Sequence, residues 1–115
     1  MTFFDSNGYN NTQDNPLWAV NPGVHATSIE AGKDTDTIIK NTSGIFFGFL
    51  VTEPDTGTPL VYNNASAASG DVVGALAASA PVGPQPGMPI QGVRCDSGIT
   101  VNGSANHPGM VILWI

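Results

Sequence analysis

Residues 60–80 read LVYNNASAASGDVVGALAASA, and the way this stretch folds decides the fold class of the chain. Its alanines favour a helix, but Gly74 costs a helix interior about 1 kcal/mol relative to alanine. Pro81 and a pair of adjacent valines also oppose a helix of such short length. We therefore predict two strands, within 60–64 and 70–78, joined by a loop of small residues.

The rest of the chain repeats this pattern of short apolar stretches separated by turns. Fourteen Gly and nine Pro among 115 residues suit short strands rather than long helices. The pattern predicts an antiparallel β-sandwich, all-β and jelly-roll-like, with about seven or eight short strands in one domain at 24–115. Besides the two strands above, the expected strand segments are 24–34, 34–44, 44–51, 90–98, 98–103 and 108–115.

Two of these segments are apolar on both faces. Alternation puts Ile45, Phe47, Phe49 and Val51 opposite Phe46, Gly48 and Leu50, and Met110, Ile112 and Trp114 opposite Val111, Leu113 and Ile115. The same rule puts Val72, Gly74 and Leu76 opposite Val73, Ala75 and Ala77. A terminal strand of this kind is expected in mid-sheet, with its own core on one face and another surface on the other.

Residues 1–23 differ from the rest of the chain and are expected to form an extended N-terminal arm. No period of 2 or 3.6 runs through this segment, so it lacks a face on which to fold by itself. Its large apolar residues are costly to leave in water, so we expect the arm to pack onto a neighbouring molecule or back onto its own domain, with disorder in the free protein as the alternative. These residues are Phe3, Phe4, Tyr9, Leu17 and Trp18.

The charge balance excludes several classes of partner. Charged residues make up 10% of the chain, against about 25% in an ordinary soluble domain. The net charge is −6 and the only bases are Lys33, Lys40 and Arg94, too few to neutralise many phosphates. We therefore expect neither nucleic acid nor an anionic membrane as a partner. No segment reaches the roughly 20 apolar residues of a membrane span, and the start of the sequence lacks the pattern of a signal peptide.

Few groups offer chemistry. Cys95 and His107 could form a thiol–imidazole pair, but a lone cysteine in an apolar strand is usually a core residue. Residues 34–36, with Glu30, could bind a hard cation, although a solvated acidic turn explains them better. Residues 96–98 read DSG, as around a serine nucleophile, and a turn explains them as well. We predict no catalytic residue, no metal site, no cofactor and no enzymatic activity.

Several stretches in order resemble a pattern in small structural proteins of tailed bacteriophages. The stretches are LVYNN at 60–64, ASAASG at 65–70, DVVGAL at 71–76, GITV at 98–101 and VILWI at 111–115. The resemblance covers about residues 40–115 and leaves the amino-terminal segment unmatched. It implies a virion protein made in the bacterial host cytoplasm, specifically a capsid decoration (cement) protein. Such proteins commonly form trimers on the head surface and bridge neighbouring major capsid proteins.

Under this reading, the strands that are apolar on both faces line the subunit interface, and the aromatic residues of the arm contact the capsid. The expected interface residues are Met110, Ile112, Leu113, Trp114, Ile115, Phe46 and Leu50. The alternative is a carbohydrate-binding or adaptor domain of a head fibre or tail. Its candidate residues are Tyr62 with Asn63 and Asn64, or Trp18 with Asn15.

Overall fold

The computed structural model describes residues 23–85 and 91–115, and within them the protein is built of nine strands without a helix. The all-β prediction is therefore confirmed. The predicted N-terminal arm, with Phe3, Phe4, Tyr9, Leu17 and Trp18, lies outside the described residues. The strands are β1 (His25–Ile29), β2 (Thr37–Lys40), β3 (Gly44–Glu53), β4 (Leu60–Tyr62), β5 (Val72–Ala75), β6 (Gly83–Pro84), β7 (Val93–Cys95), β8 (Ile99–Val101) and β9 (Gly109–Trp114).

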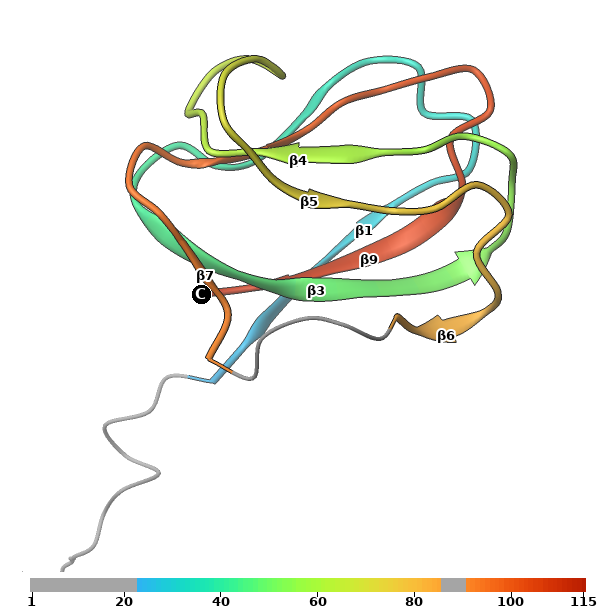
Figure 1. Ribbon diagram of the computed structural model, residues 1–115, viewed down its shortest axis with the longest axis horizontal. Coiled ribbons are helices and arrows are strands. Elements are labelled where there is room, and N and C mark those ends of the chain that lie inside the picture. The colour runs from blue at the N-terminus through green and yellow to red at the C-terminus, as the bar shows by residue number, and fades with distance from the viewer. Residues whose placement is uncertain (1–22, 86–90) are drawn as a thin grey trace, which may run out of the picture.

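The strands form two antiparallel sheets that stack as a sandwich (Figure 1). The five-stranded sheet has the order β1-β9-β3-β6, with β7 also paired to β3, and the four-stranded sheet has the order β2-β8-β4-β5. The last strand, β9, lies between β1 and β3, which confirms its predicted place in mid-sheet. Consecutive strands β1 and β2 do not pair with each other, because they belong to different sheets.

The stretch that decides the fold forms two strands, as predicted. β4 and β5 pair antiparallel, and the small residues between them form a loop. Gly74 does more than weaken a helix. A Cβ built on it would lie 2.6 Å from Cε2 of Phe46, so glycine leaves the space that the Phe46 ring fills between the sheets.

The core lies between the two sheets and is wholly apolar in its centre. Phe46 and Phe49 meet edge to face there, with ring centroids 5.2 Å apart. The buried apolar residues are Ile29, Phe46, Phe49, Val51, Val61, Leu76, Ala80, Cys95, Ile99, Val101, Met110 and Ile112.

A bulge in β3 corrects the predicted division of its faces. Phe46 pairs with Trp114 and Gly48 pairs with Leu113, so Phe47 is an extra residue between adjacent positions of β9. Gly48 follows it at φ +147°, a conformation that glycine adopts readily. The extra residue shifts the alternation by one, so Phe46 joins Phe49 and Val51 in the core instead of facing away from them.

A second irregularity corrects the faces of β5 in the same way. Tyr62 pairs with Val72 and Val61 pairs with Gly74, which leaves Val73 as the extra residue. Val72 is therefore 50% exposed on the outside, while Gly74 faces the core.

The core also corrects three of the expected interface residues. Met110, Ile112 and Phe46 are at most 1% exposed within a single chain, so they pack in its own core and have no surface left for a partner. The faces of β9 were divided as predicted, but the face with Met110 and Ile112 is the inner one.

Candidate functional site

The outer face of the five-stranded sheet carries an apolar surface that the described residues only partly cover. Leu50 pairs with Val111, and Leu113 lies beside them on the same face, opposite Gly48. The side chains of Leu50, Val111 and Leu113 are each half-buried. We call Leu50, Val111 and Leu113 the outer apolar patch. Two of the expected interface residues, Leu50 and Leu113, belong to it.

At one end of this face, the main chain at Gly92 covers side chains of β3. A Cβ built on Gly92 would lie 2.5 Å from Cγ2 of Ile45 and 3.0 Å from Cδ1 of Phe47, so the main chain before β7 packs closely on both side chains. Gly92 has φ +78°, which favours glycine and allows this close approach.

Trp114 and Ile115, the other two expected interface residues, lie at the end of the sandwich. Trp114 packs against the core, its Nε1 donates to Oγ1 of Thr27 at 2.8 Å, and its ring stacks on His25 at 4.6 Å. It therefore closes the end of the core. Ile115 exchanges main-chain hydrogen bonds of 2.9 and 3.0 Å with Ile45 and remains half-buried.

The outer face of the four-stranded sheet is covered differently, by the loop at 64–70. Thr100 lies in the middle of β8, pairs with Tyr62 and Ile38, and is fully buried. Its hydroxyl donates to the main-chain oxygen of Asn64 at 2.8 Å. The amide of Ala68 donates to Oδ2 of Asp36, at the start of β2, at 3.3 Å. The loop therefore runs back along the sheet and covers its centre.

Hydrogen bonds from a few polar side chains hold this loop. Oδ1 of Asn64 accepts from the amides of Ser66 and Ala67 at 2.9 and 3.0 Å, and its Nδ2 donates to the main-chain oxygen of Ser69 at 3.1 Å. Asp36 also accepts from the amide of Gly103 at 3.1 Å. Gly98, just before β8, lets the loop backbone lie close to the sheet, since a Cβ built on it would be only 2.8 Å from Cα of Ala65.

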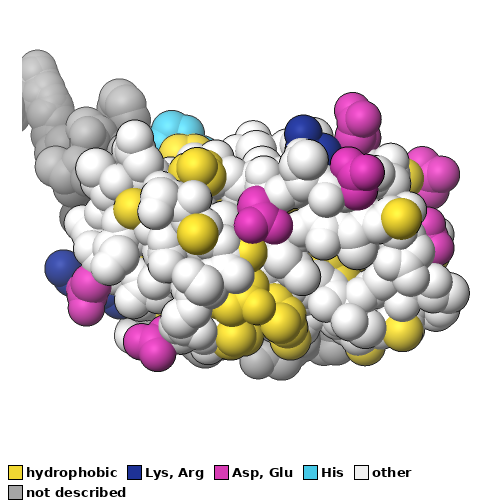
Figure 2. Space-filling view, turned by 90° about the horizontal axis from the view of Figure 1, so that it is seen from above, with side chains coloured by type: hydrophobic (Ala, Val, Ile, Leu, Met, Phe, Trp, Pro, Cys, Tyr) yellow, Lys and Arg dark blue, Asp and Glu magenta, His cyan; other side chains and the backbone are white. Residues whose placement is uncertain are grey.

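Two apolar residues remain open on either side of this loop. Ile38 on β2 and Val72 on β5 are each 50% exposed, while Tyr62 between them is half-buried. Figure 2 shows this side of the molecule, where hydrophobic side chains form separate groups in a mostly polar surface. Sequence reasoning missed both residues. The alternation of residues 37–40 was the available signal for Ile38, whereas Val72 depended on the bulge.

The candidate residues for carbohydrate binding serve the fold. Oδ1 of Asn63 accepts from the amide of Ser97 at 2.9 Å, and both polar atoms of the Asn64 side chain bond within the loop. Trp18 and Asn15 lie outside the described residues.

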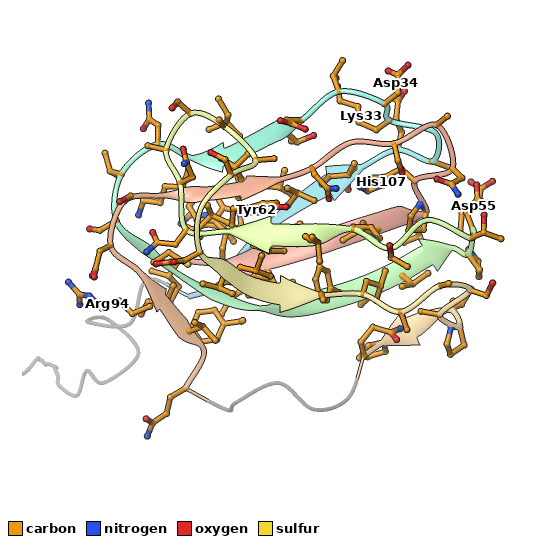
Figure 3. The ribbon with its side chains drawn as sticks, turned by 45° about the horizontal axis from the view of Figure 1, so that its top comes forward. Lys33, Asp34, Asp55, Tyr62, Arg94 and His107 are labelled. Atoms are coloured by element: carbon orange, nitrogen blue, oxygen red, sulfur yellow. The ribbon has the colours of Figure 1, made fainter. Side chains whose placement is uncertain are left out.

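The structure does not bring Cys95 and His107 together. Cys95 pairs with Gly44 at the start of β3, whereas Gly109, two residues after His107, pairs with Glu53 at its end. The two ends of β3 are about 30 Å apart, given the rise per residue of a strand. Figure 3 shows His107 at the opposite end of the sandwich from Arg94, the neighbour of Cys95. Burial raises the pKa of the Cys95 thiol, which opposes thiolate chemistry.

Acidic side chains in both turns accept hydrogen bonds from main-chain amides. Asp36 holds two amides, and Asp55 accepts from the amide of Thr56 at 2.7 Å. Among the residues described, no three His, Cys, Asp or Glu side chains form a group able to hold a metal ion. The described part of the chain also has no helix long and apolar enough to span a membrane.

Comparison of the chain with protein-family models, with curated proteins and with solved structures finds no match.

Proposed function

We propose that this protein is a structural component of a virion, a capsid decoration protein that forms trimers and binds the major capsid protein on the head surface. The observation that carries the proposal is the outer apolar patch. Leu50, Val111 and Leu113 lie together on one sheet face, and the described residues leave all three only half-buried. Apolar side chains that are grouped on one face and stay partly open to solvent can mark an interaction site in a soluble protein.

The low charge of the chain supports the same function. With charged residues at 10%, few groups around the patch need to be desolvated when a partner docks. Burial of the patch would contribute roughly 25 cal/mol per Å² of apolar area removed from water. The resemblance to small bacteriophage structural proteins supplies the expected partner, the major capsid protein, and a place on the capsid surface of the virion.

A matched pair of substitutions tests which face docks. Leu113→Ser places a hydroxyl in the outer apolar patch, and Ile38→Ser makes the same kind of change on the other sheet. We expect Leu113→Ser to weaken trimer formation, measured by sedimentation velocity, at least about tenfold. Ile38→Ser should change it less than about twofold. Equal effects of the two variants, or a larger effect of Ile38→Ser, would move the interface away from the patch.

The arm is tested separately. Deleting residues 1–20 should leave a folded oligomer that no longer co-sediments with empty capsids, because the arm is proposed to anchor the protein to the shell. Normal capsid binding by this truncation would remove the arm from the proposed function.

A further inference from the structure

A pocket of about 210 Å³ opens at the end of the sandwich where the two sheets meet. It is lined by Lys40, Ser43, Gly44, Ile45, Arg94 and Ile115. Lys40 ends β2 of the four-stranded sheet, and Arg94 lies in β7 of the five-stranded sheet. Two of the three basic residues of an acidic chain thus meet at one pocket.

Gly44 shapes the floor of this pocket. A Cβ built on it would lie 2.6 Å from the main-chain oxygen of Ile115 and 2.9 Å from Cδ of Lys40. Only glycine lets the aliphatic part of Lys40 and the end of β9 approach so closely. The Lys40 side chain is therefore placed by packing, with its Nζ 5.6 Å from the centre of the Trp114 ring.

The two cations keep donors to spare. Lys40 makes no ion pair within the described part of the chain. Arg94 donates through Nε to Oδ1 of Asp96 at 2.8 Å, which leaves the terminal nitrogens of the guanidinium group unused among the described residues. Asp34 and Asp55 lie at the opposite end of the sandwich (Figure 3).

We infer that this pocket binds a single carboxylate group. The Lys40 ammonium from β2, the Arg94 guanidinium from β7 and the Ser43 hydroxyl from the connection between β2 and β3 are donors for its two oxygens. The net charge of −6 opposes a polyanion or a dianion more strongly than a monoanion. The carboxylate belongs either to a small free acid or to a Glu or Asp side chain of a partner. The site would exist whether or not the protein binds a capsid.

The test is an NMR titration of the full ¹⁵N-labelled chain at low ionic strength. The probes are acetate, sulfate, the peptide acetyl-Gly-Glu-Gly-amide and the same peptide with Gln in place of Glu. We expect acetate or the Glu peptide to shift the amide signals of Ser43, Gly44 and Ile45, with weaker binding as salt rises and screens the charges. The Gln peptide should leave these signals unchanged.

Charge-removing variants locate the site. Lys40→Met keeps the aliphatic stem and should weaken binding about fivefold, as should Arg94→Gln, whose side chain is 76% exposed and so free to change without unfolding the chain. Lys33→Met, the same change as at position 40 but at the opposite end (Figure 3), should have less than about a twofold effect.

The outcomes separate the possible sources of the carboxylate. Tighter binding of the Glu peptide than of acetate supports a partner side chain, and equal or weaker binding supports a free acid. The inference is wrong if no probe shifts these amides, if the Gln peptide binds as the Glu peptide does, or if sulfate binds as tightly as either carboxylate. Equal weakening by Lys33→Met would also overturn it.

Discussion

The two outer faces of this sandwich are covered in different ways. On the four-stranded sheet, the loop at 64–70 lies over the centre, held by hydrogen bonds that Asn64 and Asp36 accept from loop amides and that Thr100 donates to the loop backbone. On the five-stranded sheet, the described residues leave the side chains of the outer apolar patch half-buried. The chain's own cover is held by specific polar contacts, whereas the patch offers apolar surface of the kind found at the centre of protein interfaces.

Both faces depend on the same core, so the largest expected effect comes from disturbing that core. Gly74→Ala places a methyl group against the buried ring of Phe46, and overpacking of this kind costs about 1–3 kcal/mol. Urea unfolding measures the loss in the free energy of unfolding.

A double variant checks the cause. Phe46→Leu shortens the ring that meets the new methyl group, so Gly74→Ala should cost less in that background than in the natural chain. Equal costs in both backgrounds would show that the contact with Phe46 is not what requires glycine.

Asn64→Ala tests the cover of the four-stranded sheet. It removes the side chain that accepts two loop amides and donates to Ser69, so we expect a loss of about 1–2 kcal/mol in urea unfolding. Hydrogen exchange at the loop amides should also become faster. Asn41→Ala, at an exposed turn, is the control and should change stability by less than about 0.5 kcal/mol. A stable variant with unchanged exchange would mean that the loop is held by other contacts.

Asp36→Asn tests the far anchor of the same loop and should have a smaller effect. The amide keeps one acceptor oxygen for the two main-chain donors, so the expected loss is about 0.5–1.5 kcal/mol. The matched control is Asp34→Asn, whose exposed side chain lies at the surface of the neighbouring turn. Equal effects of the two substitutions would assign the loss to charge rather than to the anchor.

The pH dependence of stability that Cys95 causes tests whether the edge of the five-stranded sheet at β7 stays closed. Burial raises its pKa in the folded chain, so the unfolded chain loses the thiol proton first as pH rises. The stability that the neutral thiol contributes is complete below the ordinary thiol pKa of about 8.5 and is lost as pH rises through the higher folded value.

Cys95→Ala should therefore show a smaller fall in stability above about pH 8.5 than the natural chain does. Urea unfolding of both proteins across this pH range measures the difference. Identical pH profiles would mean that the edge at β7 opens enough to leave the thiol in water.

Local sequence predicted much of this fold. Gly74 and the brevity of its segment were sufficient to exclude a helix, and the terminal strand was placed in mid-sheet because both of its faces are apolar. The bulges at Phe47 and Val73 were not predictable, because an extra residue reverses the faces without any change in composition. These two bulges place Phe46 in the core and Val72 on the surface.

The candidate site was only partly predicted. Leu50 and Leu113 were expected at an interface and do lie on an open apolar face. The loop cover depends on Ala68 and Asp36, which are 32 residues apart, and the carboxylate pocket joins Lys40 with Arg94 from different sheets. Such contacts depend on the order of the strands in the sheets, which local sequence patterns do not predict.

The central claim is that one chain leaves apolar surface for another molecule to cover. Sedimentation equilibrium of the full chain, over a range of concentrations, tests it most directly. The proposal predicts a mass of about three times 11.9 kDa for the natural protein and a shift toward a single chain for Leu113→Ser. A natural protein that stays at 11.9 kDa at every concentration would contradict it.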